Sequence, residues 1–238
     1  MTGNGSPHHW RWKKLARAPR HHEGKSYQDL RGQIRTGDLL LFRGSRLLSG
    51  VIERLSDSPY SHIAILAHWE ERVVAFQADL RGVELLPAST LVCRYSGKVD
   101  WWSLKQQARD RGGFDERALL DSALTLLGIK YAYWKLAALG VRILLGRTLS
   151  PSDAHATPDS LFCSQFVSLC YRNASDNHLD VNLLANDAST SPSDFATCGF
   201  FEPRYQLFDG SSGQACRDLL KIGPDPQVHV WDGRTRRA

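Results

Sequence analysis

A cysteine and a distant histidine are the two residues of this chain whose sequence contexts favour covalent chemistry. Cys163 stands where a polar stretch gives way to an apolar run at helical spacing, which predicts a thiol in the first turn of a helix. Free backbone N–H groups and the helix dipole favour the thiolate there, and the thiolate is the nucleophilic form. His62 opens a strand-like run far upstream. Together they predict the nucleophile and base of a thiol hydrolase or acyltransferase.

A catalytic histidine needs a third group that holds its ring and its tautomer. The apolar runs 62–68 and 72–78 are separated by a tight polar turn, and this pattern predicts an antiparallel hairpin. In such a hairpin His62 and Gln77 fall close to one rung and can point the same way. Gln77 is therefore the candidate orienting residue.

Each of these residues also has an ordinary structural interpretation. A cysteine inside an apolar helix is usually a small core residue, which is our interpretation of Cys170. A lone histidine on a strand more often makes a structural hydrogen bond than it acts as a base. Cys163 differs because it stands at the polar edge of its run, and the order of the residues strengthens the catalytic hypothesis.

The elements that must position these residues follow from periodicity and turn signals. A strand-rich middle is followed by helices, which predicts an α+β fold rather than alternating strands and helices. Beyond the hairpin, strands are predicted at 39–42, 82–86 and 99–104, and helices at 26–30, 47–55, 115–128 and after Cys163, with a helix or apolar flap at 136–145 and a capped turn at 191–195.

Length and composition set the broad class of protein. The chain has 238 residues, of which 42% are hydrophobic and 23% charged, so it can build one substantial core. The longest apolar stretch, 136–145, is too short to span a bilayer, and the N-terminus lacks the apolar core of a secretory signal. We therefore expect a cytoplasmic protein.

The five cysteines are an odd number and form no C-x-x-C pair. This argues against a disulfide framework and against a zinc knuckle, and at least one thiol should be free. Neither a metal ion nor an organic cofactor is implied.

The positive charge of the chain is concentrated at its N-terminus. Residues 1–35 hold eight Lys or Arg against Glu23 and Asp29, giving +6, so the remainder sums to −1 of the total of +5. Such an arm is suited to an anionic membrane surface, and nucleic acid is a less favoured partner. The favoured interpretation is nevertheless a solvated, partly disordered extension, since short basic arms are common.

Several of these segments, taken in order, resemble the circularly permuted branch of the NlpC-type papain-like cysteine hydrolases. The YiiX/YebB-like group is the nearest resemblance, and the lecithin:retinol acyltransferase group is a cousin. The matching segments are Thr36–Gly44 with its Gly-Asp turn, Tyr60–Ile65 around the histidine, Phe76–Ala78, Gly128–Trp134, Phe162–Val167 around the cysteine, and Ser191–Phe195.

The resemblance implies a permuted papain-like fold, with an antiparallel sheet or small barrel packed against helices. The resemblance covers roughly residues 33–205, so we expect a catalytic domain over 26–210, preceded by a basic arm over 1–25 and followed by a C-terminal extension over 211–238. Cys163 is then the nucleophile and His62 the base. The third position is often glutamate in the YiiX-like group, whereas this chain has Gln77, which can orient the ring but cannot offset its charge.

Two tyrosines have expected roles at the substrate. Tyr60 or Tyr131 would supply a second oxyanion donor or line the pocket, although both are equally explained as core aromatic residues. The backbone N–H of Cys163 is the first oxyanion donor, because it lies at a helix start.

The expected activity is a thiol-dependent amidase or peptidase that acts on a peptide, a peptidoglycan-derived peptide or an amino-acid conjugate. A lipid acyltransferase or esterase with the same residues is an alternative, since 131–145 mixes aromatic, aliphatic and basic residues. A further alternative is a non-catalytic module that binds a membrane or nucleic acid through the basic arm.

Overall fold

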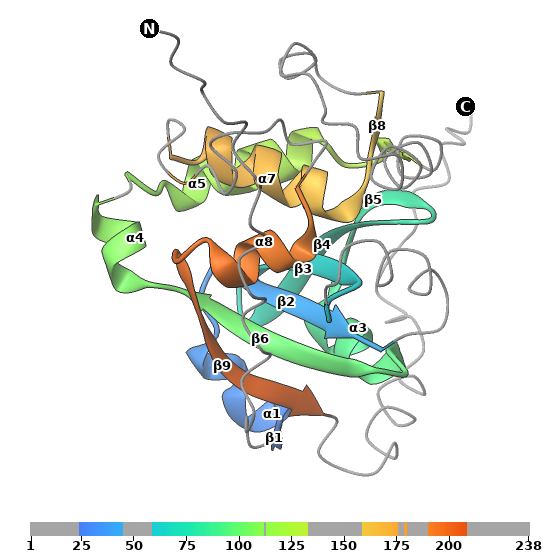
Figure 1. The fold of residues 1–238 in the computed structure, drawn as a ribbon, viewed down its shortest axis with the longest axis vertical. Coiled ribbons are helices and arrows are strands. Elements are labelled where there is room, and N and C mark those ends of the chain that lie inside the picture. The colour runs from blue at the N-terminus through green and yellow to red at the C-terminus, as the bar shows by residue number, and fades with distance from the viewer. Residues whose placement is uncertain are drawn as a thin grey trace, which may run out of the picture.

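The fold is taken from a computed structural model that describes residues 24–44, 59–111, 113–132, 159–175, 179 and 190–208. A seven-stranded sheet forms its centre, and helices cover both faces of that sheet (Figure 1). The strand order is β1-β9-β6-β2-β3-β4-β5, and every neighbouring pair is antiparallel except β1 and β9, which run parallel. The strands are β1 (Gly24–Ser26), β2 (Asp38–Arg43), β3 (His62–Trp69), β4 (Arg72–Asp79), β5 (Gly82–Pro87), β6 (Lys98–Leu104) and β9 (Phe201–Phe208).

The central strand β2 is apolar along most of its length because it is buried on both faces. Leu39 and Leu41 belong to one core, and Leu40 and Phe42 belong to the other. Successive side chains of a strand point to opposite faces, so the two cores lie on opposite sides of the sheet.

Helices occupy both cores. Residues of α5 and α7 enter the core that contains Leu41, and Figure 1 shows these two helices side by side above the sheet. Residues of α1 and α3 enter the other core. The helices are α1 (Tyr27–Leu30), the 3-10 turn η1 (Arg31–Gln33), α3 (Ala88–Arg94), α4 (Gln106–Arg111), α5 (Glu116–Thr125), α7 (Cys163–Asn173) and α8 (Pro192–Thr197).

Local sequence signals account for the ends of two helices. The Asp115 carboxylate accepts hydrogen bonds from the first N–H groups of α5, as an N-cap does. Ser191 and Asp194 form a reciprocal capping box at the start of α8, with Pro192 at the first helical position. The helix predicted over 115–128 and the capped turn predicted at 191–195 are thus confirmed.

The corner before β2 has a structural explanation. Gly37 has φ +84°, and a Cβ there would lie 2.5 Å from the Phe114 ring, so both backbone angle and space require glycine. The Tyr171 hydroxyl donates to the Gly37 carbonyl, which ties α7 to this corner. The Gly-Asp turn therefore has a structural role in positioning the helix that begins at Cys163.

The predicted strands and the hairpin of β3 and β4 are confirmed, and so is the α+β class. Helices α3 and α4 and strand β1 were not predicted. The predictions for 47–55 and 136–145 and for most of the two terminal extensions lie outside the described residues, so the domain boundaries stay predictions.

The cysteines differ in part from expectation. Cys163, Cys170 and Cys198 are free, but Cys93 is disulfide-bonded, which the spacing of the cysteines did not predict. Disulfides are uncommon in cytosolic proteins, so this bond does not favour the expected cytoplasmic location.

Candidate active site

Cys163 is the first residue of α7, as the sequence predicted. Phe162 is the N-cap, with φ −103° and ψ 167°, and the first α-helical bond of α7 runs from Phe166 N to Phe162 O at 3.0 Å. The N–H groups of the first turn therefore have no carbonyl partner within the helix. They are available to an anion that forms beside the Cys163 sulfur.

A short strand pair leads into this helix. The strands β7 (Lys130–Tyr131) and β8 (Ser160–Leu161) run parallel, and the Ala132 N–H donates to the Leu161 carbonyl at 3.0 Å. This pairing fixes the chain just before Cys163. Cys163 as a whole residue is 6% exposed, so little of it reaches solvent.

His62 and Gln77 are hydrogen-bonded through their side chains. The distance from His62 Nε2 to Gln77 Oε1 is 2.8 Å. The register that pairs Ile65 with Phe76 puts Gln77 opposite Ala64, one diagonal step from His62. The two residues therefore share a face of the sheet and lie close together, as predicted, with Gln77 diagonal to His62.

The imidazole of His62 also interacts electrostatically with Cys163. Burial lowers the pKa of His62, but the charge of the Cys163 thiolate and hydrogen bonds to Cys163 and Gln77 raise it, and the net pKa is above the ordinary 6.5. Gln77 occupies Nε2, so Nδ1 is the ring nitrogen left for the Cys163 sulfur. The ring also packs on Phe42, with centroids 5.2 Å apart.

The position of His62 in its strand explains this contact. His62 is paired with Phe42, whose side chain enters the core opposite the one that holds α7. Because His62 is the first residue of β3, it lies at the end of the sheet. His62 nonetheless interacts with Cys163, the first residue of a helix that packs on the other face.

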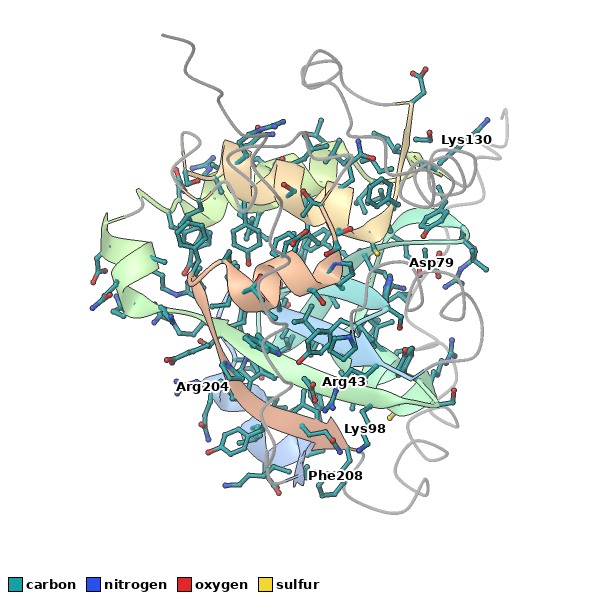
Figure 2. All side chains as sticks on the ribbon, viewed as in Figure 1. Arg43, Asp79, Lys98, Lys130, Arg204 and Phe208 are labelled. Carbon is teal, nitrogen blue, oxygen red and sulfur yellow. The ribbon has the colours of Figure 1, made fainter. Side chains whose placement is uncertain are left out.

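Gln77 has a second partner that the sequence analysis missed. Its Nε2 donates to Glu84 Oε1 at 2.8 Å, and Gln77 and Glu84 are directly paired across β4 and β5. Arg81 Nη2 lies 2.8 Å from the same Glu84 oxygen and 3.2 Å from Asp79 Oδ2. Figure 2 shows Asp79 at the turn between these strands. Assigning Leu80 and Arg81 to a two-residue turn would have predicted that Glu84 faces Gln77.

The two tyrosines have different surroundings. The Tyr60 hydroxyl donates to Asp100 Oδ2 at 3.1 Å, and Arg43 Nε lies 2.7 Å from the same oxygen. That hydroxyl is thereby held by a buried carboxylate. Tyr131 is buried in β7, where it is paired with Leu161 two residues before Cys163. The roles of both tyrosines at the substrate stay predictions.

The described residues contain no group of three or more His, Cys, Asp or Glu side chains arranged to hold a metal ion. Among the helices described, none has the length and hydropathy to cross a membrane.

The fold is similar to that of a bacterial protein of known structure. The metalloprotein YiiX from Escherichia coli O157:H7 matches with a TM-score of 0.54 and 19% identity, over 74% of this chain and 99% of that chain. The predicted permuted papain-like fold of the YiiX-like group is thereby confirmed. YiiX is named a metalloprotein, whereas the described part of this chain offers no such metal site. No protein-family model and no curated protein matches the chain.

Proposed function

We propose that this protein is a thiol-dependent hydrolase that cleaves an amide bond through an acyl-enzyme on Cys163. The observation that carries the proposal is the hydrogen bond from His62 to Gln77 at 2.8 Å, made by an imidazole whose pKa is raised by the Cys163 thiolate at the start of α7. A free thiol at a helix start, an imidazole beside it and a polar group behind the imidazole are the parts that such a reaction requires.

The reaction follows from these contacts. The Cys163 thiolate attacks the carbonyl carbon, and the oxyanion that forms is stabilised by N–H groups at the start of α7. The C–N bond then breaks, and the His62 imidazolium gives its Nδ1 proton to the leaving amine. Water attacks the thioester and gives a proton to His62. The carboxylic product leaves, and the thiolate–imidazolium pair is restored.

The substrate class in this proposal is a small peptide or an amino-acid conjugate. The same atoms would cleave an ester or pass the acyl group to an acceptor other than water, which is the lipid alternative. The apolar segment that would favour lipid lies almost entirely outside the described residues, so no contact favours that alternative. A cytoplasmic site of action belongs to the proposal too, and the redox state of Cys93 in cells would test it.

The test begins with the thiol. The protein is treated with iodoacetamide across pH, a reagent small enough for a residue that is 6% exposed, and the modified cysteines are located by mass spectrometry. Cys163 should react fastest at pH 7. Cys198 is an internal reference, because burial raises its pKa to about 11. His62→Ala should slow the alkylation of Cys163 at pH 7 by about tenfold or more, since the imidazolium that favours the reactive thiolate is then absent.

Turnover is then measured with a fluorogenic aminoacyl amide and a p-nitrophenyl acyl ester. The pKa of His62 is raised, so the alkaline limb of kcat/KM should lie above pH 6.5. By linkage, the interactions that raise the pKa of His62 stabilise the fold fully below the pKa that His62 has in the unfolded chain. That contribution is lost as pH rises through the pKa of His62 in the folded protein. Equal alkylation of Cys163 in the wild type and in His62→Ala would overturn the proposal. Cleavage of the ester but not of the amide would favour the lipid alternative.

A further inference from the structure

The Gln77 side chain can face His62 in two orientations, whereas a carboxylate would present an oxygen in either one. An amide presents an acceptor at Oε1 and a donor at Nε2, and either end can be turned toward a neighbour. Only the oxygen can accept the N–H of His62 Nε2, which leaves Nδ1 for Cys163. If the amide were reversed, its N–H would favour the other tautomer, and Nδ1 would carry the hydrogen that should come from the thiol.

Glu84 removes this ambiguity. An ionised carboxylate only accepts hydrogen bonds, so the Gln77 end that faces it must be the amide nitrogen. The observed bond, from Gln77 Nε2 to Glu84 Oε1 at 2.8 Å, has this sense. Gln77 is 4% exposed and cannot turn to water for another partner.

Glu84 is itself held in place. It is the direct cross-strand partner of Gln77, and its side chain is 19% exposed, so it joins a buried amide to the edge of the molecule. Arg81 donates to the same carboxylate oxygen and to Asp79. The chain of contacts thus runs from a surface arginine through Glu84 and Gln77 to His62.

We propose that Glu84 is a positioning residue of the active site, which fixes the Gln77 amide so that its oxygen faces His62 and Nδ1 of His62 remains free to exchange a proton with Cys163. This inference rests on the proposed function for its catalytic meaning, but its structural content is testable without turnover. In this chain Glu84 and Gln77 together do what a single orienting residue does elsewhere: the amide transmits orientation, and the carboxylate supplies it.

The test is Glu84→Gln, which keeps size and adds a donor. A second amide can present its NH2 group to Gln77 Oε1, so the Gln77 amide is free to reverse. The tautomer of His62 is read from its ¹⁵N ring shifts in histidine-labelled protein above the pKa of the ring. The wild type should show Nε2–H alone, and the variant a mixture with Nδ1–H. Turnover of the aminoacyl amide should fall about tenfold, as for other partners that orient a functional ligand.

The alkaline limb of kcat/KM provides a further readout. The titratable and charged groups that face His62 are Cys163 and Asp79, while Glu84 and Arg81 lie behind Gln77. Removing the Glu84 charge should therefore move the limb to lower pH. Glu202→Gln is the matched control, because Glu202 is also paired with an arginine, at 3.4 Å, on the distant strand β9. It should change neither the tautomer nor the rate.

A second variant distinguishes lost orientation of the His62 ring from disturbed packing of the site. In the double exchange Gln77→Glu with Glu84→Gln, the carboxylate contacts His62 directly and the amide lies behind it. This variant should recover the Nε2–H tautomer and at least part of the activity lost in Glu84→Gln. Recovery would identify the defect as one of orientation rather than of packing.

The outcomes separate the two proposals. If the wild type turns over but Glu84→Gln leaves the tautomer and the rate unchanged, the positioning role is refuted and the hydrolase stands. If the wild type has no activated thiol but the tautomer still changes in Glu84→Gln, the hydrolase is refuted and the orienting contact stands.

Discussion

Asp38 and His62 lie at opposite ends of the same pair of strands, where Asp38 is paired with Leu66 and His62 with Phe42. Asp38 is fully buried, and its two oxygens accept five hydrogen bonds. Three reach Oδ1, from Ser103 Oγ, Leu104 N and Arg109 Nη2, and two reach Oδ2, from Arg35 N and Trp101 Nε1, all at 3.0 to 3.1 Å. His62 is hydrogen-bonded through Nε2 to Gln77, and the Cys163 thiolate raises the pKa of its ring.

The difference between the two ends lies in whether the hydrogen bonding is complete. At the Asp38 end every acceptor site is filled by a donor that keeps its proton, and the arginine that balances the charge is itself 5% exposed on its side chain. Such a cluster can only hold the fold together. At the His62 end, the proposed function requires a proton to pass in either direction between His62 and Cys163. The comparison suggests that buried polar groups serve structure when they are saturated and chemistry when one proton is left to move.

The largest effect expected from this comparison concerns two cysteines of the same helix. Cys163→Ala should abolish turnover, by about 10,000-fold or more, with little change in the urea midpoint of unfolding. Cys170 is fully buried in the core, so Cys170→Ala should keep turnover and instead lower the free energy of unfolding by about 1 kcal/mol. Turnover and urea unfolding are measured on both variants. Loss of activity in both to the same degree would remove the distinction between them.

The next effect concerns the saturated end. Asp38→Asn removes the charge that balances Arg109 and turns an amide N–H toward donors, so the free energy of unfolding should fall by about 3–5 kcal/mol. Urea denaturation measures this loss. The control is Asp121→Asn in the exposed pair with Arg117, whose atoms are 4.0 Å apart, and it should change stability by less than about 1 kcal/mol. A loss equally small for Asp38→Asn would mean that its five hydrogen bonds contribute little.

The sequence was informative wherever one residue type in one local context carries the signal. The apolar run and its polar edge predicted the helix at Cys163, and the alternation around the polar turn predicted the hairpin that brings His62 and Gln77 together. Gln77 lies diagonal to His62, rather than directly opposite it, because the turn between β3 and β4 contains only Glu70 and Glu71, and Glu70 has φ +54°. Register depends on turn geometry, which the polar character of the turn residues does not specify.

Helix α3 and the role of Glu84 were not predicted, because both depend on contacts between segments that are distant in the sequence. Helix α3 has Ser89, Thr90 and Val92 among its seven residues, which are weak helix formers, and it is stabilised by packing of Ala88 and Val92 against the sheet. The role of Glu84 depends on which end of an amide faces which neighbour. That choice is made by cross-strand pairing and cannot be read from either strand alone.

The smallest effect is expected at the surface end of the contacts behind His62. Arg81 donates to both Asp79 and Glu84 and partly neutralises them. In Arg81→Ala the two carboxylates act on His62 with less compensation, so the ring keeps its proton to slightly higher pH. The alkaline limb of kcat/KM should move upward by less than it falls in Glu84→Gln, and the change should vanish near 1 M salt because the side chain is 67% exposed. Arg204→Ala, on β9, is the control. A downward movement would instead show that Arg81 acts mainly by holding Glu84 against Gln77, and that position outweighs charge at this end of the site.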